Sequence, residues 1–282
     1  MEYPLQEKVI VITGASAGLG KATAEALAQQ GALVVLVCRS QAKARQAMAE
    51  IQQKVPHANL RLHLADLSSL EQVRKLAAEL KATYPTIDVL LNNAGMIPGL
   101  QEFTPEGWEV SWAVNHLASF LLTNLLLDPL LAAPQGRVIT VSSEAHRLGE
   151  IDFTQAGNPV KYSAITSYAD SKLANIMFTY ELARRTELTP LTANTLHPGV
   201  VATSFGQNSG FLIRWLYSLG GFFMKSPEQG AKTSVFLASE PKLAGVSGKY
   251  FKNQKPVRSS GSSYNLHLAR RLWDISAEQV GL

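Results

Sequence analysis

The sequence predicts an α/β fold, in which one doubly wound parallel sheet of about seven strands carries helices on both faces. Short apolar runs rich in β-branched residues alternate with longer segments of helical period, and no linker separates two cores. This alternation is typical of βαβ units, whose strands are buried on both sides. With 282 residues, 46% of them hydrophobic and 17% charged, the chain can bury one large core. We therefore expect a single domain over residues 1–282.

Each element follows from this pattern in turn. The expected strands are residues 9–13, 33–37, 59–63, 89–91, 137–141, 192–196 and 249–251. The helices between them are expected near residues 18–30, 41–54, 69–83, 105–131, 163–188 and 227–238. The segments 143–166, 204–226 and the tail from residue 253 are expected to be irregular. They follow the carboxyl ends of strands or the last strand, and this edge is where open α/β sheets bind ligands.

Bulk composition excludes several classes of protein. The net charge of +4 comes from lysines and arginines that are spread along the chain, which argues against a nucleic-acid protein. One cysteine, Cys38, excludes an internal disulfide and a cysteine-rich zinc site, and the six histidines show no paired spacing for a metal. The start of the chain lacks a secretory signal, and no run of eighteen apolar residues occurs. We expect a soluble cytoplasmic protein without a metal or a transmembrane segment.

A glycine-rich segment, residues 13–20 (Thr-Gly-Ala-Ser-Ala-Gly-Leu-Gly), follows the first strand and precedes an alanine-rich helix. Glycines there let the backbone turn tightly and approach a diphosphate, which the amino end of the helix attracts. A purely structural turn is the alternative. The position after a first strand and the absence of a competing phosphate-loop pattern favour a dinucleotide.

The end of the second expected strand reads Cys38-Arg39. A carboxylate at this place would bind the ribose 2′-hydroxyl of NAD, whereas an arginine favours the 2′-phosphate of NADP. The sequence therefore favours NADP(H), with NAD(H) as the alternative. Arg39 could also be an ordinary solvated arginine with no role in cofactor binding.

Tyr168 and Lys172 lie four residues apart at the start of a long expected helix, and this spacing places them on one face. A nearby ammonium, together with a nicotinamide cation when the cofactor is oxidised, stabilises a phenolate, so we expect a lowered phenol pKa and a tyrosine that acts as general acid and base. Taken alone, the pair also fits an ordinary surface helix.

Six motifs in this order resemble the short-chain dehydrogenase/reductase family over nearly the whole chain. They are residues 13–20, Asn92-Asn93-Ala94-Gly95, Asn115, Ser142-Ser143, Tyr168–Lys172 and Pro198-Gly199. Residues 113–117, 141–146, 171–175 and 197–201 are similar to the retinol dehydrogenase and WW-domain oxidoreductase branch. The resemblance implies a Rossmann fold and an oxidoreductase that interconverts a carbonyl and an alcohol by hydride transfer, without a metal.

The resemblance also implies roles for individual residues. Asn115, Ser143, Tyr168 and Lys172 would form a catalytic tetrad, in which Ser143 bonds the substrate oxygen, Tyr168 moves its proton and Asn115 holds a water next to Lys172. Ser142 competes with Ser143 for the serine role. The implied cofactor contacts are Gly14, Ser16, Gly18, Leu19, Gly20, Arg39, Asp66, Leu67, Asn93, Ala94, Gly95, Tyr168, Lys172, Pro198, Gly199, Val201 and Thr203.

Two segments bear on the substrate. Ser143 and Tyr168 are 25 residues apart, which implies an insertion at residues 147–166 near the substrate mouth. Residues 204–226 are rich in Phe, Leu, Trp and Tyr; the family has a substrate lid there, which favours an apolar or aromatic carbonyl compound. A subunit contact and a membrane-surface helix are the second and third interpretations of this segment.

The predicted partners are one small carbonyl or alcohol substrate and further copies of the chain, as a homodimer or homotetramer, with no nucleic acid. The rival function is a catalytically inactive NADP(H)-binding redox sensor or scaffold of the same fold. An intact tetrad and the lack of an added interaction module favour the enzyme.

Overall fold

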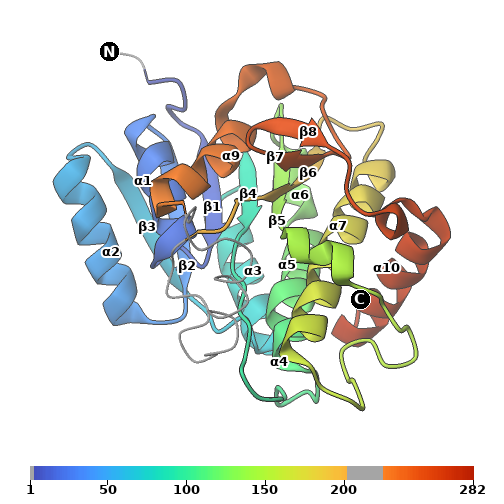
Figure 1. Cartoon of the computed structure of the whole chain (residues 1–282). Helices are drawn as coiled ribbons and strands as arrows, with labels where there is room; N and C mark the ends of the chain where they lie inside the picture. Colours follow the sequence, from blue (N-terminus) through green and yellow to red (C-terminus); the bar gives the residue numbers. More distant parts are fainter. Residues whose placement is uncertain (1–2, 202–224) are drawn as a thin grey trace.

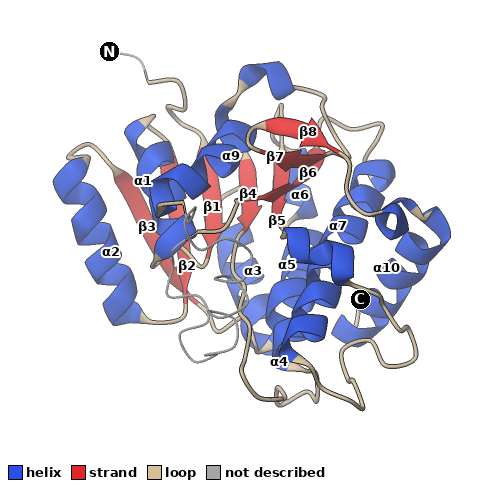
Figure 2. Ribbon diagram, in the orientation of Figure 1, coloured by secondary structure: helices blue, strands red, loops and turns tan. Residues whose placement is uncertain are grey.

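The structure of the chain is a computed structural model that describes residues 3–201 and 225–282. One eight-stranded sheet runs through it in the order β3-β2-β1-β4-β5-β6-β7-β8 (Figures 1 and 2). The strands are β1 (Val9–Thr13), β2 (Leu33–Cys38), β3 (Asn59–Leu64), β4 (Val89–Asn92), β5 (Arg137–Val141), β6 (Thr192–His197), β7 (Tyr250–Lys252) and β8 (Lys255–Val257). All neighbouring pairs are parallel except β7 and β8.

Helices cover both faces of the sheet (Figure 2). One face packs against α1 (Gly18–Gln29), α2 (Gln41–Lys54) and α9 (Pro227–Ser239). The other packs against α3 (Leu70–Thr83), α5 (Ala118–Leu125), α6 (Leu127–Leu131), α7 (Ala164–Arg185) and α10 (Leu266–Val280). Successive residues of a strand point to opposite faces, so each inner strand supplies both cores; Ile10 and Ile12 enter the first core and Val11 the second. The predicted doubly wound α/β fold is confirmed.

The expected count of about seven strands is low by one, because β8 pairs antiparallel with β7. Asn253 and Gln254 join the two strands with left-handed φ values of 52° and 62°, the conformation that a tight hairpin turn needs. β8 has three exposed residues and contains a proline, so it has neither the apolar run nor the alternation that marks a strand in sequence.

The tail from residue 253 is also more ordered than predicted. Asn265 caps α10 by accepting a hydrogen bond from the Leu268 N–H, and Gly281 ends the helix in the left-handed conformation. One face of α10 is buried at Ala269, Leu272, Ser276 and Val280. That spacing is helical and could have been found in the sequence.

The helix expected over residues 105–131 is wrong as a single element. It begins at α4 (Val110–Trp112), where the Glu109 carboxylate accepts from the Ser111 and Trp112 N–H groups. A π-helical turn, η1 (Ala113–Leu117), follows before α5 and α6. Such turns occur often at functional sites, and this one carries Asn115. The expected helices at 18–30 and 163–188 match α1 and α7 within three residues at each end.

Candidate active site

The candidate site lies at the carboxyl edge of the sheet, where β1, β4, β5 and β6 end. Parallel strands bring their carboxyl ends to one edge, so residues far apart in sequence meet there. The strands end at Thr13, Asn92, Val141 and His197, and the predicted motifs follow each of them directly.

The glycine-rich turn is held between β1 and β4. The Thr13 hydroxyl accepts hydrogen bonds from the N–H groups of Asn93 (2.9 Å) and Ala94 (3.0 Å). The Asn93 amide donates to the Thr13 carbonyl at 2.8 Å. Gly14 has a φ of 67°, and a Cβ on Gly20 would lie 2.4 Å from the Gly14 carbonyl oxygen. Both glycines are therefore required by the backbone.

The turn leads into a helix end that suits an anion. At the start of α1, which lies within the described residues, the N-cap residue Ala17 makes no side-chain hydrogen bond to the free N–H groups. The first turn of this helix contains no acidic residue. The first N–H groups of a helix lack partners within the helix and attract negative charge. The turn and the end of α1 thus fit the diphosphate of a dinucleotide, with Gly14, Ser16, Gly18, Leu19 and Gly20 around it.

The ends of β2 and β3 form the other side of this region. Arg39 is 73% exposed in its side chain, and its guanidinium lies 3.9 Å from the Asp66 carboxylate. Asp66 accepts from the Ser68 hydroxyl at 2.7 Å, while Ser69 caps α3. Cys38 is buried, and burial raises the pKa of its thiol to about 11. An exposed cation therefore stands where NAD-selective sites need a carboxylate.

Asn115 and Gly95 meet in the centre of the site. The Asn115 side chain is fully buried; its Oδ1 accepts from the Met96 N–H (2.8 Å) and its Nδ2 donates to the Ser171 hydroxyl (3.0 Å). A Cβ on Gly95 would lie 3.2 Å from Asn115 Oδ1 and 3.3 Å from Lys172 Nζ. A larger residue at position 95 would therefore crowd both side chains.

Lys172 is buried on α7, and its Nζ donates to the Val141 carbonyl at 3.1 Å. Burial lowers the pKa of this ammonium to about 8. Its Nζ lies 5.5 Å from the centroid of the Tyr168 ring, so the spacing of four does place the two side chains on one face.

The structure separates the two serines after β5. Ser142 is buried, and its hydroxyl donates to the Lys172 carbonyl at 2.8 Å. Ser143 is partly exposed, and its hydroxyl forms a hydrogen bond with the Tyr168 phenol that lowers the phenol's pKa. Of the two, only Ser143 adjoins the tyrosine.

Tyr168 differs from the expectation in the direction of its pKa. Burial raises the pKa of the phenol to about 12, and the Ser143 hydrogen bond offsets this only in part. The prediction of a lowered pKa gave the ammonium too much weight, because Lys172 sits above the ring and is itself desolvated. In the chain alone, the phenol holds its proton at neutral pH.

The β6 side of the site is described up to Val201. Gly199 has a φ of 95°, and the Lys225 side chain lies beside it, where a Cβ on Gly199 would be 2.8 Å from Lys225 Cδ. Val201 and Lys225 form a short parallel bridge. The predicted contact Thr203 and residues 204–224 of the expected lid lie outside the described residues.

Sequence reasoning missed two residues of the turn after β5, Glu144 and His146, which follow closely after Ser143. His146 is buried, with Nδ1 2.6 Å from the Ser143 carbonyl. Glu144 accepts from the Tyr250 hydroxyl at 2.7 Å and pairs with Lys252 and Arg147. The only signal was two ionisable residues within a segment that follows a buried strand.

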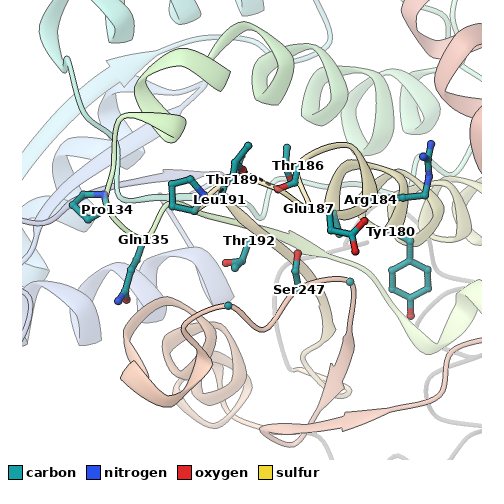
Figure 3. A pocket seen from close by; sticks show the side chains of 14 residues that line it. Pro134, Gln135, Tyr180, Arg184, Thr186, Glu187, Thr189, Leu191, Thr192 and Ser247 are labelled. Carbon is teal, nitrogen blue, oxygen red and sulfur yellow. Dashed lines mark hydrogen bonds between the residues drawn. The ribbon is translucent and has the colours of Figure 1, made fainter.

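A cavity of about 540 Å³ lies elsewhere, between the end of α7 and the start of β6 (Figure 3). It is lined by Tyr180, Arg184, Glu187, Thr192 and Ser247 among others. Thr192 begins β6, so the cavity opens at the edge of the sheet opposite to the candidate site and is not part of it.

Comparison with known proteins decides the family. The family model "short chain dehydrogenase" matches residues 8–210. The chain belongs to the short-chain dehydrogenase family. Human retinol dehydrogenase 14 is 40% identical over 98% of this chain and 87% of its own length, and human retinol dehydrogenase 11 is 41% identical over 99% and 87%. The predicted family and its retinol dehydrogenase branch are thus confirmed.

Solved structures agree with this assignment. An uncharacterised protein of Mycobacterium paratuberculosis superposes with a TM-score of 0.81 at 30% identity and covers 99% of this chain and 96% of that one. A Shigella flexneri short-chain dehydrogenase in complex with NADP gives 0.70 at 25% identity, covering 90% of this chain and all of that one. As a member of this family, the chain is an NAD(P)-dependent oxidoreductase acting on alcohol and carbonyl groups.

The described residues contain neither a membrane-spanning helix nor a cluster of metal-binding side chains. None of the helices in residues 3–201 and 225–282 has the length and apolar composition to cross a bilayer. Over the same residues, no three His, Cys, Asp or Glu side chains gather as a metal site would require.

Proposed function

We propose that the chain is an NADP(H)-dependent oxidoreductase that interconverts a carbonyl and an alcohol on an apolar or aromatic small molecule, with Tyr168 as general acid and base. The observation that carries the proposal is the meeting of Tyr168, Ser143 and Lys172, held by α7 and the end of β5. When bound, the nicotinamide cofactor supplies or takes up the hydride.

In the proposed reduction, the Ser143 and Tyr168 hydroxyls bond the substrate oxygen, and Tyr168 gives it a proton. A phenol whose pKa is raised to about 12 by burial carries that proton at neutral pH. Two hydroxyls aimed at one oxygen also stabilise the negative charge that develops on it. Lys172, a buried cation next to the ring, then favours the phenolate that is left behind.

We propose that Asn115 fixes the position of segment 95–96 relative to the part of α7 that carries Lys172. Its side-chain bonds go to Met96 and Ser171, so its amide groups are occupied by protein. The water that the family resemblance implies would therefore bind at the Asn115 backbone carbonyl in the π-helical turn. That carbonyl also accepts from the Ser119 hydroxyl at 3.3 Å.

Arg39 supports NADP(H) over NAD(H), because an exposed guanidinium can bond a 2′-phosphate. The Shigella flexneri relative in complex with NADP is consistent with this choice. Asp66, Leu67, Asn93, Ala94, Pro198, Gly199 and Val201 are proposed as further contacts of the cofactor.

The substrate class rests on two exposed apolar side chains in segments that follow Gly95 and precede α7. Leu100 and Val160 are 77% and 82% exposed. Their segments are joined by the Gln101 amide, which donates to the Pro159 carbonyl, and by Tyr162, which donates to the Pro98 carbonyl. Segment 96–104 leaves the site directly after Gly95, so these residues suit the mouth of an apolar pocket. The relatives' names, retinol dehydrogenases, point to the same class of substrate.

A single domain over residues 1–282, a homodimeric or homotetrameric assembly and a cytoplasmic location complete the proposal. These three parts rest on the sequence pattern.

The test is a panel of retinaldehyde, nonanal, benzaldehyde, acetophenone and menadione, followed by NADPH absorbance and repeated with NADH. We expect turnover of the apolar members with a preference for NADPH. Tight NADPH binding with no turnover across the panel would overturn the proposal in favour of a redox sensor or scaffold.

A further inference from the structure

His146 is bonded on both sides of its ring. Nδ1 lies 2.6 Å from the Ser143 carbonyl oxygen, and Nε2 lies 3.0 Å from the backbone nitrogen of Ser260. A backbone N–H can only donate, so Nε2 is the acceptor in the second bond. The ring proton must then be on Nδ1, which donates to Ser143. The two bonds thus define one neutral tautomer.

The surroundings hold the ring in this state. His146 is fully buried in the 3₁₀ turn η2 (Glu144–Leu148), and its ring meets Tyr250 edge to face at 5.0 Å. The Tyr250 hydroxyl donates to Glu144, which also pairs with Lys252 of β7. Burial lowers the pKa of His146, which is consistent with a neutral ring.

The same turn is connected to the C-terminal segment. Arg147 donates to the Arg258 carbonyl at 2.8 Å, next to the bond from Ser260 to His146. The Ser259 hydroxyl bonds Tyr180 of α7 at 2.9 Å. Residues 258–260 therefore contact both the turn that carries Ser143 and the helix that carries Tyr168.

We infer that His146 is a positioning residue, which fixes the Ser143 peptide against the C-terminal segment so that the Ser143 hydroxyl stays on the Tyr168 phenol. The Ser143 carbonyl accepts from both the N–H and the Nδ1–H of His146. The Ser143 hydroxyl accepts from the Ala145 N–H at 3.2 Å, so backbone and hydroxyl are tied to the same turn. Loss of the ring leaves the Ser143 carbonyl with the backbone N–H of His146 and removes the link to Ser260, so the peptide is held less firmly.

The inference rests on the proposed function, because it explains how the Ser143 hydroxyl is held in line with the Tyr168 phenol for the proposed reaction. Misalignment of a group that bonds the reacting oxygen lowers the rate of the chemical step. The glycine-rich turn makes no bond to His146 in the described chain, so cofactor binding should not change. If His146 served folding alone, its loss would lower the amount of folded enzyme. It would not lower kcat per folded enzyme while leaving the affinity for NADPH unchanged.

The kinetic test compares three variants by kcat, KM and NADPH affinity, with nonanal as the probe. His146→Asn keeps an amide N–H near the position of Nδ1, His146→Gln places its amide near Nε2, and His146→Leu removes both groups. We expect kcat to fall about tenfold or more in His146→Leu, which removes both ring bonds, and to fall less in His146→Asn and His146→Gln, each of which keeps a polar group at one of the two positions. The dissociation constant of NADPH should change by less than about twofold.

The control is His267→Leu, which removes an exposed histidine of α10 and should leave kcat unchanged. Equal kcat in wild type and all three His146 variants would overturn the inference. If wild type itself reduces neither nonanal nor another panel member, the proposed function fails instead.

A measurement without substrate keeps the inference testable in that case. In ¹⁵N-labelled protein, two-bond ¹⁵N–¹H correlations of histidine rings distinguish the tautomers. We expect one ring with its proton on Nδ1, absent from the spectrum of His146→Asn. An Nε2–H tautomer or a positively charged ring at this position at neutral pH contradicts the assignment.

Discussion

At the scale of single residues, burial sets the chemistry of the site. It raises the pKa of Tyr168 to about 12 and lowers that of Lys172 to about 8, so desolvation favours the neutral form of both side chains. Sequence spacing predicted their proximity and got the direction of the phenol shift wrong. Spacing reports which side chains share a face, whereas desolvation depends on what the turn η1, β5 and the turn after β5 place around them.

The raised pKa of Tyr168 makes reduction and oxidation respond differently to pH. Because the phenol is protonated up to high pH, the proton donor for reduction is present throughout the neutral range. Oxidation needs the phenolate, whose fraction grows about tenfold per pH unit below the working pKa. We expect kcat/KM for oxidation of 1-nonanol to rise between about pH 6 and pH 8 while reduction of nonanal changes little, and the rise should level off above about pH 8, where Lys172 loses the charge that favours the phenolate. An oxidation rate that falls over this range would contradict the assignment.

Arg39 carries the prediction on cofactor choice. Arg39→Asp removes the cation and places a carboxylate where NAD-selective sites have one. The ratio of kcat/KM for NADPH to that for NADH should fall by about a hundredfold, because a charge-assisted contact is replaced by repulsion. Arg45→Asp, at an exposed position of α2, is the matched control. An unchanged ratio in Arg39→Asp would show that this guanidinium does not select the cofactor.

At the scale of elements, the helix that carries Tyr168 and Lys172 also carries a residue that lowers stability at neutral pH. Asp170 lies on this helix between Tyr168 and Lys172, and burial raises the pKa of its carboxyl to about 6 although it accepts a hydrogen bond from the Glu150 N–H. The same desolvation that serves the site therefore acts on a neighbour that has no assigned role in it.

Asp170→Asn should stabilise the protein at neutral pH. The folded carboxyl has the higher pKa, so the folded state binds the proton more tightly and its stability falls as the pH rises from about 4 to 6. Asparagine removes this penalty and retains an oxygen for the Glu150 N–H. We expect a gain of about 1–2 kcal/mol at pH 7 and none near pH 4 by urea unfolding. Asp274→Asn, at an exposed position, should be neutral, and a loss of stability in Asp170→Asn at pH 7 would refute this.

Elements with a strong local pattern were predictable, and those decided by tertiary contacts were not. Apolar runs identified β1, β2, β4 and β5, whose residues are almost all buried, and the glycine-rich turn identified the start of α1 because the backbone requires its glycines. The π-helical turn at Asn115 follows from contacts with Met96 and Ser171, which no local pattern contains. His146 was likewise invisible as a functional residue because its partner Ser260 lies 114 positions away.

At the scale of the whole molecule, the C-terminal helix completes the core beside the site. Leu272 is fully buried, and Trp273 packs on Phe120 of α5 and Phe178 of α7. Ser276 hydrogen-bonds His116, the neighbour of Asn115, at 2.8 Å. The tail thus supports α7, which carries Tyr168 and Lys172, and the π-helical turn η1, which carries Asn115.

Leu272→Ala should lower the free energy of unfolding by about 2–4 kcal/mol, because it leaves a cavity between α10 and the sheet-facing helices. Leu266→Ala, at a position on the same helix with 58% exposure, should cost less than about 0.5 kcal/mol. Urea unfolding followed by circular dichroism measures both. Equal losses in the two variants would mean that α10 does not pack as described.

Tyr168→Phe tests whether Tyr168 moves the proton in a reaction that depends on NADP(H). Phenylalanine keeps the ring above which Lys172 sits and removes only the hydroxyl. In single-turnover measurements with NADPH and nonanal, we predict that the rate of NADPH oxidation falls by about a hundredfold or more while the dissociation constant of NADPH stays within about twofold. A variant that oxidises NADPH at the wild-type rate would contradict the account.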